Sequence, residues 1–178
     1  MSGDYSRWSF EPWRNFGAVL MQQGRILTDD DWNQWASILL RRFQAETVDA
    51  LGRAVVPLET PDGFLIELPA KGGLTIGLGR AYVDGLLAEN HGDPREEWHP
   101  VLAELRGATS TRYEEQPYLP DPVALPVGGP HLVYLKVWQR ELTAVEEPDL
   151  IEKALGIDTT ARQQTVWQVK LVSVGGIA

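Results

Sequence analysis

VLMQQGRILTDDDWNQWASILLRR, residues Val19–Arg42, contains the strongest start signal for a helix in the 178-residue chain. Thr28 stands before three aspartates, and a Thr or Asp side chain at such a position accepts hydrogen bonds from the N–H groups of the first helical turn. The negative charges of Asp29–Asp31 also interact favourably with the positive, N-terminal end of the helix dipole. Apolar residues then recur at three- and four-residue steps up to Gly52, a natural helix stop. The pattern predicts a one-sided helix that ends near Leu51 and packs against a sheet or another subunit. Its apolar side consists of Trp32, Trp35, Ala36, Leu39, Phe43, Thr47 and Ala50.

Residues 1–18, on the N-terminal side of this stretch, have neither a helical nor a strand period. Four tryptophan and phenylalanine residues lie here among serine, proline, arginine and asparagine, and they would remain in water unless the segment packs against something. We therefore predict an extended arm over residues 1–18 that lies against its own domain or against a neighbouring subunit. These four residues of the arm are Trp8, Phe10, Trp13 and Phe16.

Beyond Gly52, proline and glycine divide the chain into short apolar runs that read as strands. Asp84-Gly85 is a good two-residue hairpin turn. The last two strands are expected to pair, with a short helix over residues 148–155 in their connection. The predicted strands span residues 64–68, 74–78, 80–84, 86–89, 131–140 and 165–174.

The order of these elements predicts an α+β fold, in which one long amphipathic helix packs on a mainly antiparallel β-sheet. Residues 19–178 are expected to form a single domain after the arm. Residues 91–130 carry much of the proline and most of the polar loop signals, so they are predicted to form a long loop excursion with a helical turn near residues 102–106.

The composition of the chain argues against several classes of function and location. A formal net charge of −9 repels phosphates and argues against a nucleic-acid partner. The chain has no cysteine, so disulfides, thiolate zinc sites and cysteine nucleophiles are absent. No apolar stretch approaches the length of a membrane span, and the N-terminus lacks the pattern of a secretory signal. We expect synthesis and assembly in the cytoplasm.

Two polar groups resemble metal sites in composition but not in spacing. Asp29–Asp31 lack the DxDxDG spacing of a calcium loop, and helix capping explains them more simply. The densest polar cluster contains no HExxH, and Pro94 and Pro100 mark it as a loop, so a solvated loop is favoured over a zinc site. This cluster consists of His91, Asp93, Glu96, Glu97 and His99. No metal or cofactor is predicted.

A catalytic pair is considered at Asp84 and Glu89, two carboxylates on adjacent predicted strands of the kind that glycosidases use. The hairpin turn already explains Asp84, which leaves one carboxylate. The chain also has no complete GxGxxG, no P-loop and no GxSxG. We therefore predict a protein that is not an enzyme and has no catalytic residue.

Candidate interface residues lie outside the parts that folding rules explain. In Met21-Gln22-Gln23-Gly24-Arg25, glutamines can donate and accept hydrogen bonds and Arg25 can bind carboxylates, so this loop could dock on a partner subunit. The structural alternative, which we favour, is that Arg25 pairs with one of Asp29–Asp31. In the strand over residues 131–140, Val133, Leu135 and Val137 share one face, which leaves Tyr134 and Trp138 on a second face that needs cover from within the chain or from another subunit.

Five segments, taken in order, resemble an uncharacterised family of N-terminal domains in phage-tail-like proteins encoded near contractile injection systems and prophage tails. Longer members of that family often continue into a right-handed β-helix. The resemblance touches nearly the whole chain, although the region of Trp13–Phe16 and residues 91–130 depart from it. The segments are GDYSRWSF at Gly3–Phe10, VLMQQGRILTDDDWNQ at Val19–Gln34, GRAYVDGLLAEN at Gly79–Asn90, VYLKVWQRELTAVEEPDLIEKALG at Val133–Gly156 and TTARQQTVWQVKL at Thr159–Leu171.

The resemblance implies a structural, assembly role in a phage tail or a tail-like contractile injection particle, at the baseplate or associated with a fibre. The expected partners are other tail or baseplate proteins and copies of the chain itself. A binding module at the tail tip that recognises a cell-surface glycan through residues 91–130 is the alternative. A cell-wall-degrading enzyme using Glu89 or the polar cluster ranks last.

Overall fold

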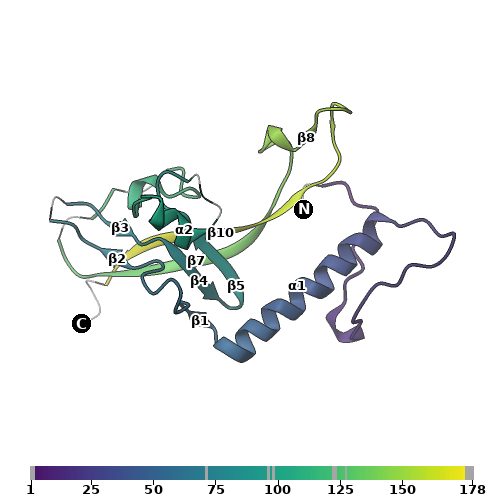
Figure 1. The fold of residues 1–178 in the computed structure, drawn as a ribbon, viewed down its shortest axis with the longest axis horizontal. Helices are drawn as coiled ribbons and strands as arrows, with labels where there is room; N and C mark the ends of the chain where they lie inside the picture. The colour runs from purple at the N-terminus through teal and green to yellow at the C-terminus, as the bar shows by residue number, and fades with distance from the viewer. Residues whose placement is uncertain are drawn as a thin grey trace. The chain divides into compact units, whose positions relative to one another are not determined.

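The computed structural model describes residues 3–174 apart from 71, 96, 98, 122, 123 and 127. Its internal contacts divide the chain into two compact units. Unit 1 comprises Met1–Gly52 and Glu141–Gln164, and unit 2 comprises Arg53–Arg140 and Thr165–Ala178. The fold is α+β, as predicted, with one long helix and several small sheets (Figure 1). The predicted division into an arm over 1–18 and one domain over 19–178 stays a prediction.

Unit 1 is built around the helix α1, Asp29–Leu51. The helix begins and ends where the sequence predicted. The Thr28 hydroxyl accepts a hydrogen bond from the Asp31 N–H, and the Asp31 carboxylate accepts one from the Thr28 N–H, which together form a capping box. Gly52 ends the helix at a φ of +104°, a conformation that favours glycine. The arm contains the 3-10 turn η1, Pro12–Arg14.

Unit 2 contains two three-stranded sheets of short strands. One sheet has the order β1-β4-β5, formed by antiparallel strands Ala54–Val55, Gly79–Val83 and Leu86–Asn90. The other has the order β2-β3-β6, formed by antiparallel strands Ile66–Glu67, Thr75–Ile76 and Thr111–Arg112. Asp84 and Gly85 both have positive φ angles, +47° and +78°, between β4 and β5. The predicted two-residue hairpin turn is thus confirmed.

The two longest strands, β7 (His131–Leu142) and β10 (Arg162–Ser173), pair with each other. The Val174 N–H donates to the Pro130 carbonyl at 3.1 Å, so the end of β10 lies beside the start of β7 and the strands run in opposite directions. The predicted pairing of the late strands is confirmed.

The predicted helix over residues 148–155 is wrong. Only the 3-10 turn η3, Pro148–Leu150, forms there. The chain then makes a small hairpin of β8 (Ile151–Glu152) and β9 (Ile157–Asp158). Two β-branched isoleucines and a turn closed by Gly156 at φ +71° favour strand pairing over a helix.

Residues 91–130 contain more regular structure than a loop. The helix α2 spans Pro100–Leu105 and includes most of the predicted helical turn. Strand β6 and the 3-10 turn η2, Tyr113–Glu115, follow. Tyr113 and Gln116 are buried, so this segment supplies part of the interior of unit 2.

The core of unit 2 surrounds Trp167, which is only 2% exposed. Its ring makes edge-to-face contacts with Phe64 at 5.0 Å and with Tyr118 at 6.1 Å, and its Nε1–H donates to the Glu89 carbonyl at 2.8 Å. The aliphatic face of β7 packs against this core through Val133, Leu135 and Val137, as predicted. Other members of the core are Leu74, Ile76, Ala81, Ala88, Tyr113 and Val169.

The side-chain amide of Gln116 takes the place of a strand beside β10. Its Oε1 accepts from the Val169 N–H at 2.7 Å, and its Nε2 donates to the Val169 carbonyl at 3.1 Å. The same Nε2 donates to the Tyr113 carbonyl at 2.9 Å. All polar atoms of this buried amide therefore have partners.

Candidate assembly surface

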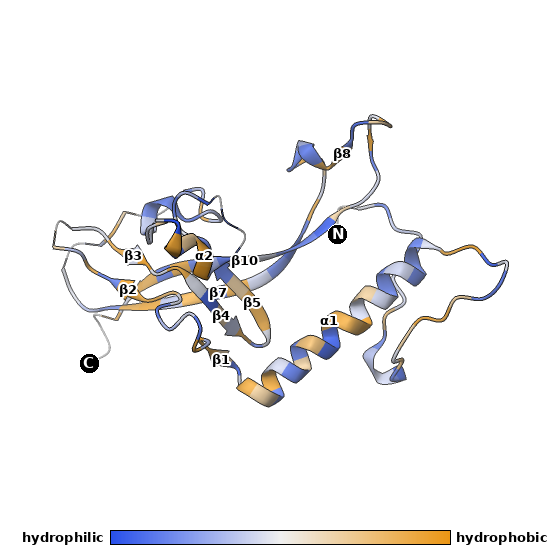
Figure 2. Ribbon diagram, in the orientation of Figure 1, coloured by the Kyte–Doolittle hydropathy of each residue, from blue (hydrophilic) through white to orange (hydrophobic). Residues whose placement is uncertain are grey.

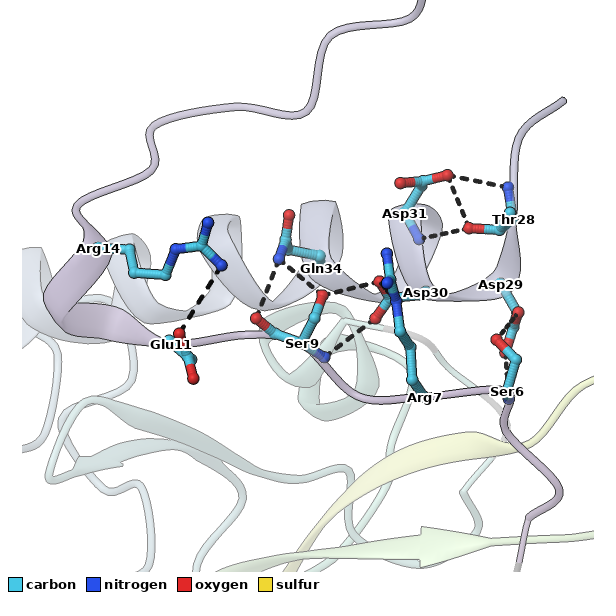
Figure 3. Close-up of polar contacts among 10 residues, drawn as sticks. All are labelled: Ser6, Arg7, Ser9, Glu11, Arg14, Thr28, Asp29, Asp30, Asp31 and Gln34. Atoms are coloured by element: carbon cyan, nitrogen blue, oxygen red, sulfur yellow. Dashed lines mark hydrogen bonds and ion pairs between the residues drawn. The ribbon is translucent and has the colours of Figure 1, made fainter. Parts of the chain in front are cut away.

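The arm is attached to the first turn of α1 by hydrogen bonds to two aspartates (Figure 3). Asp29 accepts from the Ser6 N–H at 2.9 Å and from the Ser6 hydroxyl at 2.6 Å. Asp30 accepts from Arg7 Nε at 2.6 Å, from the Ser9 N–H at 3.0 Å and from the Ser9 hydroxyl at 2.8 Å. We call this set of contacts, Ser6, Arg7 and Ser9 with Asp29 and Asp30, the arm latch.

The environment of the arm latch keeps its carboxylates charged. Asp30 is 3% exposed, and this burial raises the pKa of its carboxyl, but hydrogen bonds from Ser9 and Arg7 outweigh burial and hold the pKa below its ordinary value. Hydrogen bonds from the Ser6 side chain and backbone likewise lower the pKa of Asp29. Gln34, one turn further along α1, donates to the Ser9 carbonyl at 3.1 Å and the Ser9 hydroxyl at 2.9 Å.

The three consecutive aspartates have separate partners. Asp29 and Asp30 hold the arm, whereas Asp31 completes the capping box with Thr28, whose hydrogen bonds lower the pKa of Asp31. The arginine that pairs with this cluster is Arg7 rather than the predicted Arg25. Within the described part of the chain, no group of three or more His, Asp or Glu side chains is arranged to hold a metal ion.

Sequence reasoning missed Ser6, Arg7 and Ser9. They lie in the segment GDYSRWSF, which carried part of the resemblance without an assigned role. The sequence did offer one sign of these contacts. One arginine and two serines can donate the hydrogen bonds that a run of aspartates accepts.

The arm also meets the end of β7 inside unit 1. The Gly3 N–H donates to a Glu141 carboxylate oxygen at 2.5 Å. Burial raises the pKa of the Tyr5 hydroxyl, and the nearby Glu141 charge and hydrogen bond raise it further. The arm is therefore fastened by its backbone and its polar side chains.

The apolar side of α1 is exposed in the described chain. Trp32 is 58% exposed and Phe43 is 62% exposed, and the Trp32 and Trp35 rings lie 5.6 Å apart. At 100° per residue, Asp30 and Gln34 point roughly 160° away from Trp32. The arm thus covers the polar side of the helix and leaves the predicted apolar side open, and Figure 2 shows hydrophobic segments recurring along α1.

Most predicted interface residues of the arm and the following loop are exposed. Trp8, Trp13, Phe16 and Met21 are exposed, as are Gln22, Gln23 and Arg25, while Phe10 is half-buried. The Arg25 N–H donates to the Gln22 carbonyl at 3.2 Å, which closes a turn around Gly24 at φ +70°. Leu20 and Ile26 flank this turn, and Ile26 is 89% exposed.

The second face of β7 is partly open. Tyr134 is exposed, and Trp138 is half-buried with the Lys136 ammonium 4.8 Å from its ring centre. These two residues belong to unit 2, whereas the other interface candidates belong to unit 1.

Four of the residues considered and disfavoured as catalytic or zinc-binding groups are accounted for by structural features. Glu89 pairs with Arg80 at 2.9 Å across the β4–β5 hairpin, and Asp84 lies in the turn. In the polar cluster, the buried Glu97 pairs with Arg106 at 2.6 Å, and Asp93 forms a backbone bridge with Thr109. Glu96 lies outside the described residues.

A comparison with protein-family models matches residues 1–177 to one family of unknown function, DUF6519. The chain belongs to the DUF6519 family. No curated protein and no solved structure matches this DUF6519 chain in the corresponding comparisons. Among the described residues, the DUF6519 chain has no helix that is both long and apolar enough to cross a membrane.

Proposed function

We propose that this DUF6519 chain is a non-enzymatic assembly module of a phage tail or a phage-tail-like contractile injection particle. It acts through contacts with other tail or baseplate proteins and with copies of itself. The link to tail particles rests on the resemblance of the five segments quoted above. The observation that carries an assembly role is the exposed apolar side of α1.

An exposed row of large aromatic residues is unusual for a chain that acts alone. Each such residue buries roughly 150–250 Å² when it is covered, so Trp32, Trp35 and Phe43 supply much of the apolar area of a small interface. Tyr, Trp and Phe are also the residues enriched at the centres of interfaces.

The arm latch supports this proposal because it acts on the opposite side of the helix. Together with Gln34 it fixes residues 6–9 against the start of α1, so the first turns of the helix are held without using the apolar side. A helix held in this way presents its aromatic residues at a low entropic cost to a partner.

The two other candidates have less support. Glycan binding by residues 91–130 needs exposed aromatic rings, but among the described residues of this segment Tyr113 is buried and Tyr118 packs on Trp167. A glycosidase needs a free pair of carboxylates, but Glu89 is paired with Arg80.

The proposal is tested by the incorporation of the chain into particles. We expect Trp32→Ser with Phe43→Ser to abolish incorporation, measured by mass spectrometry of purified particles together with electron microscopy. Arg41→Ser, an exposed residue on the other side of α1, is the matched control and should leave incorporation unchanged. Wild-type incorporation of the double variant, or normal particles that lack the chain altogether, would contradict the proposal.

A further inference from the structure

Two surfaces of unit 1 are apolar, exposed and opposite in charge. The first is the loop Gly17–Leu27, here called the QQGR loop, which exposes Leu20, Met21 and Ile26 around its turn. The second is the β8–β9 hairpin with its flanks, residues 143–160, which exposes Val145, Leu155 and Ile157. Because these surfaces are exposed within the same chain, neither covers the other there.

The charges of the two surfaces are complementary. Residues 17–27 contain one arginine, Arg25, and no acidic residue. Residues 143–160 contain five acidic residues and one lysine. The acidic residues are Glu146, Glu147, Asp149, Glu152 and Asp158.

We propose that the QQGR loop of one copy docks on the β8–β9 hairpin of the next copy. Ile26, Leu20 and Met21 then cover the aliphatic residues of the hairpin, and Arg25 faces its carboxylates. This inference names one partner for the assembly module and rests on the proposed function for its biological setting.

A second copy of the chain is the occupant that the charges favour. The whole chain carries a net charge of −9, so two copies repel each other unless surfaces of opposite sign meet. The QQGR loop and the hairpin are such a pair, and every copy has both. Contacts between different surfaces of identical chains lead to a ring or to an open array rather than to a two-fold dimer.

Self-association of the full chain, measured by analytical ultracentrifugation over a range of concentration, tests this inference. Wild type should associate, and added salt should weaken the association, because the exposed charges are screened. We expect Arg25→Glu to weaken association by about tenfold or more, and Glu147→Arg with Asp149→Arg to do the same.

Mixing the two variants gives the decisive measurement. Each has one altered surface that complements the altered surface of the other, so the mixture should regain association to within about threefold of wild type. Recovery in the mixture also proves that both variants are folded. Arg41→Glu is the charge-matched control for the loop, and Glu59→Arg with Glu104→Arg is the control for the hairpin, since these residues are exposed elsewhere.

Three outcomes would overturn the inference. They are a chain that stays monomeric at every concentration, association that is unaffected by either set of substitutions, and variants with native circular dichroism whose mixture does not associate. Each leaves the proposed function standing if incorporation into particles still depends on Trp32 and Phe43. Conversely, head-to-tail association of a chain that enters no particle would refute the proposed function and leave this inference intact.

Discussion

A cluster of aromatic residues is buried in the core of unit 2, whereas the aromatic residues on α1 of unit 1 are exposed. Trp167 lies inside a cluster with Phe64 and Tyr118, and even its indole N–H has a partner. On α1, the buried residues are Asp30 and Ile38, and the tryptophans face outward. Unit 2 is thus held by apolar burial, while the arm of unit 1 is held by hydrogen bonds. The difference shows that large aromatic side chains build the core of unit 2, whereas polar contacts fasten the arm of unit 1 and leave the α1 tryptophans exposed.

The largest effect is expected when a buried tryptophan of unit 2 is compared with an exposed tryptophan of α1. Trp167→Ala should lower the free energy of unfolding of unit 2 by about 3–5 kcal/mol, because it leaves a cavity and an unpaired Glu89 carbonyl. Trp32→Ala should change the free energy of unfolding by about 0.5 kcal/mol or less, because its side chain is exposed. Urea unfolding of both variants measures the two values. Equal losses would mean that α1 is already covered in the isolated chain.

A smaller effect is expected from Asp30→Ala in the arm latch. The change removes three hydrogen bonds to a charged group, so detachment of the arm should become easier by about 1.5–3 kcal/mol. Hydrogen exchange at the Ser6 N–H, which donates to Asp29 and keeps its acceptor in this variant, reports the detachment, and the exchange should be about 10- to 100-fold faster. Asp49→Ala, an exposed aspartate at the other end of α1, should leave the Ser6 exchange unchanged.

The smallest effect is the pH dependence of the arm latch. Asp29 and Asp30 have lowered pKa values in the folded chain. Their contribution to the stability of the attached arm is therefore fully present above the ordinary pKa of an aspartate and is lost as the pH falls through the lower, folded values. An NMR titration of the Ser6 and Ser9 amides should therefore show release of the arm only below about pH 4. The Val169 N–H donates its hydrogen bond to the side-chain amide of Gln116, which does not titrate. Its signal therefore serves as the internal reference. Release of the arm near neutral pH would contradict the assigned carboxylate contacts.

Local signals made α1 and the β4–β5 hairpin predictable. Thr28, Asp31 and Gly52 act on backbone groups within four residues of themselves, so the sequence contains the whole reason for the helix ends. Asp84-Gly85 likewise determines its own turn. The aliphatic face of β7 was predictable because side chains alternate along a strand.

Contacts between distant residues were not predictable in the same way. The β8–β9 hairpin forms because Ile151 and Glu152 pair with Asp158 and Ile157, and a helical pattern of the same residues gives no sign of it. The arm latch joins Arg7 to Asp30 across more than twenty residues, so capping accounted for the aspartates without pointing to the arm. The spacing of apolar residues along α1 also did not indicate which side of the helix the arm would cover.

The Gln116 amide has a consequence for how copies of the chain can meet. A strand edge with free N–H and carbonyl groups invites another chain to add a strand, which leads to unlimited sheet growth. At Val169 both groups of β10 are already occupied by Gln116, so strand addition is blocked there. Gln116 therefore closes this point of the β10 edge with a side chain, so backbone pairing by an added strand is not available at Val169.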